Sequence, residues 1–226
     1  MDQVNQLKKA VGDKAAEFVE SGMTLGLGSG STVYYFLKKL AEFVKDGMKI
    51  QGVPTSFQTA AWAKKFGIPL THLASGKRVD LAVDGADEID PHFNLIKGGG
   101  GCLLREKIVA ANAKCLIIIA DETKQVATLG KFGLPVEVVP FGSEIIADYI
   151  RDLGGTAKMR TLENGDPFVS DNGNYLFDCD FGLIDDPGQL HNELKSLVGV
   201  VETGLFIQMT DTILIGKENE VKVLKK

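Results

Sequence analysis

The sequence lacks any long apolar run. No stretch approaches the roughly 20 residues that a membrane-spanning helix requires, and the N-terminal segment MDQVNQLKKAVGDK has no apolar core of the signal-peptide type. Neither a membrane protein nor a secreted protein is therefore indicated, and we expect a cytoplasmic location.

Cysteine and histidine are also scarce. The chain has 3 cysteines and 3 histidines, all widely separated, with no C-x-x-C pair. An odd number of scattered cysteines predicts neither a disulfide framework nor a zinc site, and the histidines do not show metal-ligand spacing. A reducing compartment fits this pattern.

Positive charge is not concentrated anywhere in the chain. The formal net charge is −5 with a pI near 5.3, which argues against nucleic acid or an anionic membrane as the main partner. A small-molecule ligand is expected instead. With 226 residues, 44% of them hydrophobic, the chain can bury a full core as one large domain or two small ones.

Strands and helices alternate along the first half. The periodicity predicts helices near residues 7–19, 33–44 and 56–66, with strands at 23–27, 49–54, 81–83 and 115–120. The last of these, Leu116–Ala120 with Cys115 before it, is a continuous apolar run of the kind found in parallel sheets covered on both faces. The expected fold class is therefore α/β, with a Rossmann-like, mostly parallel sheet.

From about Leu129 the pattern changes to strand, helix, two strands, helix, strand. This order is typical of a split βαβ, ferredoxin-like α+β module. The predicted organisation is a Rossmann-like catalytic domain formed by residues 1–128 and 204–226, with a small α+β domain at 129–203. The segment Gly204–Met209 is expected to return to the first domain, followed by a strand at 212–215 and a Lys-rich tail.

A Gly/Ser/Thr loop follows the first predicted strand and precedes a helix. Its residues Ser29, Gly30, Ser31 and Thr32 would place hydroxyls and backbone donors at a helix N-terminus, which favours an anion such as phosphate. The loop lacks the lysine and spacing of a P-loop, and the third glycine of a dinucleotide fingerprint. The alternative is a tight turn with an N-cap and no ligand. Lys8 could reach a phosphate here, although lysines on helix surfaces are usually only solvated.

Reactive side chains gather in VDLAVDGADEIDPHFNLIKGGGGCLLREK, residues 79–107. Carboxylates follow the third predicted strand, and a lysine precedes four glycines whose backbone N–H groups can approach a ligand. A glutamate comes in the first turn of the next helix, where the dipole favours its ionised form. The catalytic candidates are Asp84, Asp87, Lys97 and Glu106, and the further ligand-binding candidates are Gly85, Ala86, Gly98, Gly99, Gly100 and Lys124.

Together these groups suit enolisation next to a carbonyl in a small sugar phosphate, and they could act without a metal or a cofactor, so we expect neither. Glu106 would act as general base, Lys97 and the glycine amides would stabilise the developing oxyanion, and Asp84 or Asp87 would move hydroxyl protons. Glu88 and Asp90 are predicted to be solvated loop carboxylates.

Four motifs, in this order and spacing, resemble the A-type ribose-5-phosphate isomerases over essentially the whole chain: GLGSGST, DGADEID, LIKGGGGCLLREK and ADETKQV. The resemblance implies interconversion of ribose 5-phosphate and ribulose 5-phosphate through an enediolate in the pentose phosphate pathway, without metal. It implies that Glu106 is the base and that Asp84 is associated with ring opening. It also implies a homodimer or tetramer.

Two rival interpretations belong to other classes. A non-catalytic sugar-phosphate sensor would keep the phosphate loop but would not need Glu106 and both aspartates, and it would usually carry a DNA-binding segment. An amino-sugar phosphate deaminase would want a histidine or similar acid at the ring oxygen, and none is placed there. A nicotinamide oxidoreductase is the weakest rival, given the loop.

Overall fold

The computed structural model describes residues 3–74, 76–218 and 220–226 and divides into two compact units. The first consists of Met1–Ala86, Arg105–Lys124 and Met209–Lys226, and the second of Asp87–Leu104 and Gln125–Gln208.

The first unit contains a six-stranded sheet in the order β13-β12-β6-β3-β1-β2. Five strands are parallel, and only the edge strand β13 runs antiparallel. The predicted Rossmann-like, mostly parallel sheet is confirmed. The strands are β1 Thr24–Leu27, β2 Gln51–Pro54, β3 Leu81–Asp84, β6 Leu116–Asp121, β12 Thr212–Lys217 and β13 Glu220–Lys225.

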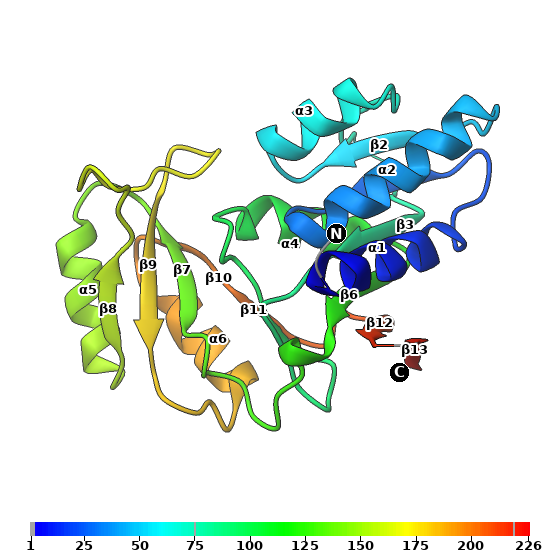
Figure 1. The fold of residues 1–226 in the computed structure, drawn as a ribbon. Helices are drawn as coiled ribbons and strands as arrows, with labels where there is room; N and C mark the ends of the chain where they lie inside the picture. Colours follow the sequence, from blue (N-terminus) through cyan, green and yellow to red (C-terminus); the bar gives the residue numbers. More distant parts are fainter. Residues whose placement is uncertain (1–2, 75, 219) are drawn as a thin grey trace. The chain divides into compact units, whose positions relative to one another are not determined.

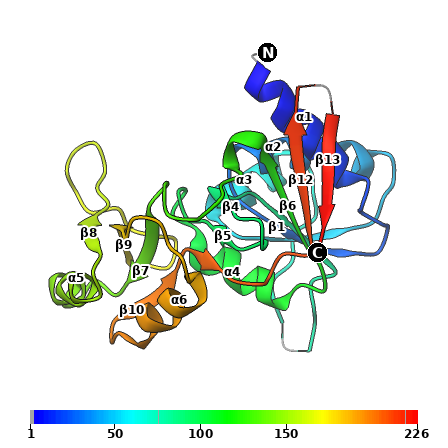
Figure 2. The ribbon, with the colours of Figure 1, turned by 90° about the horizontal axis from the view of Figure 1, so that it is seen from below.

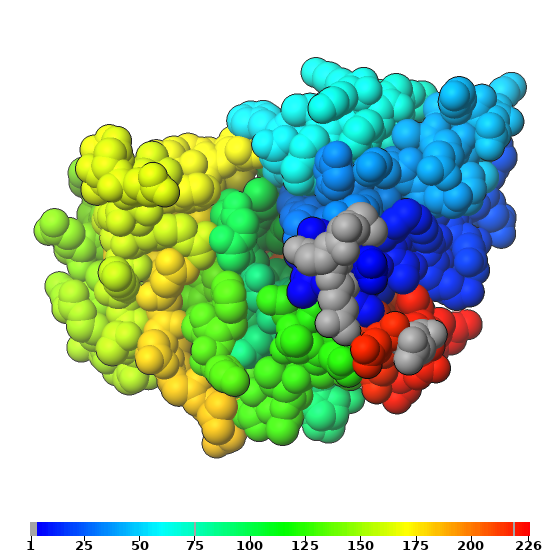
Figure 3. Space-filling view, in the orientation of Figure 1, coloured from blue at the N-terminus to red at the C-terminus, as the bar shows by residue number. Residues whose placement is uncertain are grey.

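Four helices accompany this sheet, and α1 and α2 lie side by side against one face of it (Figure 1). Their apolar positions, among them Val11 and Phe36, are fully buried in a core with the strands. Figure 3 shows the N-terminal helix beside the C-terminal hairpin, so α1 packs against β12 and β13 in this unit. In the described part of the chain, no helix combines the length and apolar character needed to cross a membrane. The helices are α1 Gln3–Ala16, α2 Ser31–Lys45, α3 Phe57–Lys65 and α4 Leu103–Asn112.

The strand order reverses between β1 and β3. The chain passes from β1 outward to β2 and then returns to place β3 on the other side of β1. Loops leaving the carboxyl ends of β1 and β3 therefore diverge, which opens the kind of crevice in which ligands bind in open parallel sheets. The loops that begin after Leu27 and Asp84 both start at this point.

The second unit contains a four-stranded antiparallel sheet in the order β10-β7-β9-β8. This order, with helices after the first and third strands, is the split βαβ arrangement that the sequence predicted. Figure 2 shows the module from below. Its elements are β7 Leu134–Val138, α5 Ser143–Asp152, β8 Thr156–Met159, β9 Tyr175–Asp180, α6 Pro187–Ser196 and β10 Val200–Thr203.

A second, three-stranded sheet in this unit was not anticipated. It consists of β4 Glu88–Ile89, β5 Leu95–Ile96 and β11 Leu205–Phe206. Because β11 pairs with β5, residues 204–208 lie with the second unit, whereas the sequence suggested a return to the first domain. Residues 87–104 also belong to the second unit, because they contain β4 and β5, and β5 pairs with both β4 and β11. The Lys-rich tail, for which no strand was predicted, forms β13.

Candidate active site

The anion loop of the first unit runs from the end of β1 into α2. Gly30 caps the helix with φ 102° and ψ 173°, a conformation that favours glycine. Ser31 and Thr32 form the first turn, where backbone N–H groups have no partner within the helix. A 15-residue helix therefore presents the positive end of its dipole beside two hydroxyls.

Asp84 is built into this loop from the neighbouring strand. The residue is only 4% exposed, and its Oδ1 accepts hydrogen bonds from the backbone N–H groups of Ser29 (3.0 Å) and Gly85 (2.8 Å). A Cβ on Gly28 would lie 2.3 Å from the Asp84 Cγ, so only glycine permits this approach. The structure thus joins two predicted site segments, 29–32 and 84–85, at the point where the strand order reverses.

A hydroxyl cluster, which the sequence did not reveal, supports the loop from the β2–α3 connection. The Ser29 Oγ lies 2.8 Å from Thr55 Oγ1, 2.9 Å from Ser56 Oγ and 3.3 Å from Thr59 Oγ1. Thr59, fully buried, also donates to the Gly28 carbonyl at 2.8 Å. In the sequence, the only sign of this cluster is that two hydroxyl residues, Thr55 and Ser56, directly follow the predicted strand at 49–54.

Lys8 contacts the same loop. Its Nζ donates to the Ser31 Oγ at 2.8 Å, from helix α1. A positive charge is therefore held at the first turn of α2, where the sequence had favoured a merely solvated lysine.

Glu106 lies in the first turn of α4 and is 6% exposed. One turn later, Val109 packs against β1, where a Cβ on Gly26 would lie 2.5 Å from its Cγ1. Because α4 connects the parallel strands β3 and β6, it runs antiparallel to them, and Glu106 lies nearer than Val109 to the carboxyl ends of the strands. The adjacent Arg105 guanidinium stacks 4.5 Å from the ring centroid of Phe57, at the start of α3.

Lys124 ends a short 3-10 helix, η1 (Glu122–Lys124), which follows β6 directly. It is half-buried. Since β6 is parallel to β3 and β1, Lys124 leaves the same edge of the sheet as the anion loop and Asp84.

The second unit carries the glycine loop. The Gly99 N–H donates to Asp87 Oδ2 at 2.8 Å, and the Gly101 N–H donates to the Gly98 carbonyl at 2.9 Å. Lys97 is 3% exposed, and its Nζ lies 5.4 Å from the ring centroid of Phe206. The loop tip, Gly99 and Gly100, is exposed. One glycine amide that the sequence assigned to the substrate therefore holds a catalytic candidate instead.

The prediction that Glu88 and Asp90 are solvated was wrong. Glu88 is 3% exposed and accepts from the backbone of Gly130 and Phe132, each at 2.7 Å. Asp90 is 9% exposed and accepts from the N–H groups of residues 92 and 94, each at 2.8 Å. Both carboxylates satisfy loop amides, which offsets the cost of their burial. Among the described residues, no group of three or more histidine, cysteine or acidic side chains could hold a metal ion.

The candidate residues thus form two sets. The first unit brings Ser29, Asp84 and Gly85 into direct contact, and also carries the remaining candidates Gly30, Ser31, Thr32, Ala86, Glu106 and Lys124. The second unit brings Asp87 onto the glycine loop, next to Lys97. The chain itself links the two sets, at Ala86–Asp87 and within α4.

Comparison with known proteins gives consistent matches. A family model described as ribose 5-phosphate isomerase A (phosphoriboisomerase A) matches residues 51–220. The chain is 50% identical over 224 residues to ribose-5-phosphate isomerase A 1 of Oceanobacillus iheyensis, covering 99% of this chain and 100% of that one. The structure of ribose 5-phosphate isomerase from Plasmodium falciparum superposes with a TM-score of 0.95 at 42% identity, covering 98% and 99% of the two chains. A D-ribose-5-phosphate isomerase solved in complex with phospho-erythronic acid gives a TM-score of 0.95 at 40% identity, with full coverage of both chains.

Proposed function

The chain belongs to the ribose 5-phosphate isomerase A family, and from this premise we propose how its residues carry out the reaction. It is an aldose-ketose isomerase that interconverts D-ribose 5-phosphate and D-ribulose 5-phosphate in pentose phosphate metabolism. The roles of the individual residues are our proposal.

The observation that carries the proposal is the contact between Asp84 and the Ser29 amide at the reversal of the strand order. It ties a buried carboxylate to a loop suited to phosphate. In our proposal the substrate phosphate binds at Ser29–Thr32, with charge supplied by Lys8 and Lys124, and the sugar extends toward Asp84. The complex of a related isomerase with phospho-erythronic acid, which combines a phosphate and a carboxylate, is consistent with a site for two anionic groups.

Glu106 is the proposed general base. Its carboxylate takes the proton from the hydroxyl-bearing carbon next to the carbonyl, and the electron pair left behind forms the carbon–carbon double bond of the enediolate. The negative charge moves to the former carbonyl oxygen. Glu106 then returns the proton to the former carbonyl carbon, so that aldose becomes ketose. Its place in the first turn of α4 supports this role, since the helix dipole favours the carboxylate form.

Lys97 is proposed to stabilise the oxyanion. A buried ammonium acts in a low-dielectric environment, in which a charge–charge interaction is stronger than in water. The Gly98 and Gly100 amides are the proposed neutral donors beside it.

The two aspartates are proposed to move the hydroxyl protons. Asp84 would accept the proton of the anomeric hydroxyl as the bond between the anomeric carbon and the ring oxygen breaks, and would deliver a proton to the released ring oxygen. Backbone amides already fix the orientation of its carboxyl group. Asp87 would exchange a proton between the two oxygens of the enediolate, and the Gly99 amide fixes it similarly.

We further propose that the enzyme acts in the cytoplasm, without a metal ion, as a homodimer or tetramer. The assignment of the catalytic role to the Rossmann-like domain is also a proposal. Light scattering coupled to size-exclusion chromatography measures the oligomeric state directly.

The deciding experiment compares wild type with Glu106→Gln in the conversion of ribose 5-phosphate, with a chelator present. Removing the base should lower the rate by about 10²–10⁴-fold, with little effect on phosphate-driven binding. Glu17→Gln serves as the control, because Glu17 is an exposed carboxylate on the first unit that pairs with Lys14. Turnover that survives Glu106→Gln would place the base elsewhere.

A further inference from the structure

We propose that Arg160 is a positioning residue that sets the direction in which the peptide groups of the glycine loop face, and thereby places Asp87 and the Gly100 amide for the reaction. The inference rests on the function proposed above for this loop. Arg160 follows β8 in the small α+β module, far along the chain from every residue that the sequence singled out.

The Arg160 guanidinium contacts the backbone of the loop. Its Nη1 donates to the carbonyl oxygens of Gly98 at 3.0 Å and Gly99 at 3.1 Å. On its other side, Nε donates to Asp178 Oδ2 at 3.1 Å, and Nη2 donates to Oδ1 of the same carboxylate. The Arg160 side chain is 15% exposed, so it acts largely shielded from water.

Peptide geometry turns these contacts into an orientation. In a planar trans peptide the carbonyl of one residue and the N–H of the next point in opposite directions. With the Gly98 carbonyl directed at Arg160, the Gly99 N–H points away from the guanidinium, and it donates to Asp87. With the Gly99 carbonyl also directed at Arg160, the Gly100 N–H likewise points away. Arg160 therefore holds two consecutive amides facing away from itself.

The loop has little rigidity of its own, so an external clamp matters. Gly98 and Gly101 have φ values of 107° and 78°, and glycine is the residue with the greatest freedom to rotate its peptide groups. Phe168 supports the same loop, since a Cβ on Gly101 would lie 2.5 Å from its Cζ, and the Arg160 Cζ lies 5.8 Å from its ring centroid.

Only arginine suits this position. Its planar fork donates to the loop carbonyls on one edge and to Asp178 on another, whereas lysine is a point charge without that geometry. The guanidinium also polarises the two carbonyls, which strengthens the donors on the same peptide groups.

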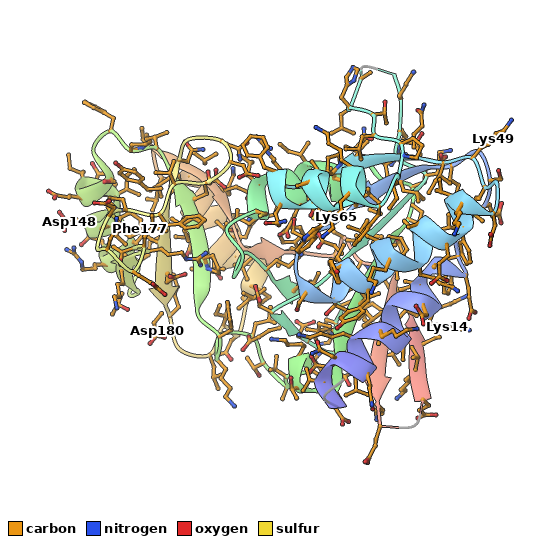
Figure 4. The ribbon with its side chains drawn as sticks, turned by 45° about the horizontal axis from the view of Figure 1, so that its top comes forward. Lys14, Lys49, Lys65, Asp148, Phe177 and Asp180 are labelled. Carbon is orange, nitrogen blue, oxygen red and sulfur yellow. The ribbon has the colours of Figure 1, made fainter. Side chains whose placement is uncertain are left out.

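The test measures steady-state kinetics and thermal unfolding of Arg160→Met, Arg160→Lys and Asp178→Asn. Arg151→Met is the matched control, because Arg151 also pairs with an aspartate, Asp148, which is exposed on α5 (Figure 4). For Arg160→Met we expect kcat and kcat/KM to fall together by about 10²-fold, the effect of misplacing catalytic groups by roughly 1 Å. For Arg160→Lys we expect kcat and kcat/KM to fall by about tenfold, and for Asp178→Asn by less than that. Arg151→Met should match wild type.

A double-mutant cycle with Asp87→Asn separates positioning from general stability. If Arg160 acts through the Gly99 peptide, Arg160→Met should cost much less when Asp87 is already replaced. Fully additive losses, or a lowered unfolding temperature with unchanged kcat in the folded protein, would overturn the inference. If Arg160→Met does not fold, Asp178→Asn decides, and an unchanged kcat in that variant would also overturn it. Loss of activity in Glu106→Gln together with full activity in Arg160→Met refutes this inference alone, whereas activity in Glu106→Gln refutes the proposed base.

Discussion

Replacing Gly28 with alanine tests the central contact of the site. The added Cβ would lie 2.3 Å from both Cγ and Oδ1 of Asp84 and 2.6 Å from its Cα. Ordinary carbon contacts begin near 3.5 Å, so the aspartate must move by about 1 Å. The ends of β1 and β3 cannot simply move apart to make room, because the Gly28 N–H donates to the Val83 carbonyl at 2.9 Å.

The expected magnitude follows from these distances. Overpacking in a well-packed region costs about 1–3 kcal/mol, and weakening the hydrogen bond from the Ser29 amide to a buried carboxylate adds about 1–2 kcal/mol. We therefore expect Gly28→Ala to lower the free energy of unfolding by roughly 2–5 kcal/mol. If Asp84 acts in catalysis as proposed, a displacement of about 1 Å in its carboxylate should also lower kcat/KM by about 10²-fold.

Urea unfolding and ribose 5-phosphate turnover measure the two effects separately. Gly188→Ala is the control, because its Cβ would meet nothing closer than 3.4 Å, in the first turn of α6. Alanine in a helix is favoured over glycine, so the control should be neutral or slightly stabilising. If Gly28→Ala kept both wild-type stability and wild-type turnover, the close approach of Asp84 to the anion loop would be refuted.

Two further predictions concern the first unit. Thr59→Val keeps the shape of a buried side chain but removes its hydrogen bond to the Gly28 carbonyl. We expect KM and the inhibition constant of inorganic phosphate to rise by about tenfold with kcat nearly unchanged, and Thr59→Ser to restore both; a change in kcat alone would contradict this. The pKa of Asp80 is lowered from 3.8, first by its hydrogen bond with Lys114 and then by the Thr24 amide. A lowered pKa stabilises the fold above 3.8, and this effect is lost as the pH falls through the folded-state value. Asp80→Asn should therefore lower the unfolding free energy by at most about 1 kcal/mol near neutral pH, and by less at an acid pH below 3.8. Urea unfolding at both pH values checks this, and a difference that is undiminished in acid would argue against the ion pair.

The parts of the fold that the sequence predicted are those governed by local pattern. The apolar run Leu116–Ala120 is too long and too continuous for a half-exposed strand, and it lies buried between two parallel neighbours. The order of strands and helices after residue 129 likewise defined the small module. Two-residue strands such as β11 carry no periodicity, so their pairing could not be predicted from the sequence.

The site shows the same division. The sequence could predict that Ser29 and Asp84 lie close together, because each follows an apolar strand and parallel strands bring such positions to one edge. Thr59 was not identified, because it lies in the first turn of an ordinary helical segment and contacts the anion loop only when α3 packs beside it. Glu88 was misjudged because the amides that it accepts from come 42 and 44 residues later in the chain.

The glycine loop marks where inference from sequence reaches its limit. A run of glycines predicts that backbone amides are accessible, but the same freedom leaves the direction of each peptide open. That direction depends on what holds the carbonyls, and here the holder is Arg160, about 60 residues later. The Gly99 amide consequently serves Asp87 and is not available for the substrate in this arrangement. In the proposed mechanism the glycine loop therefore owes the direction of its donors to the charged side chain behind it, and that side chain cannot be identified by searching the motif itself.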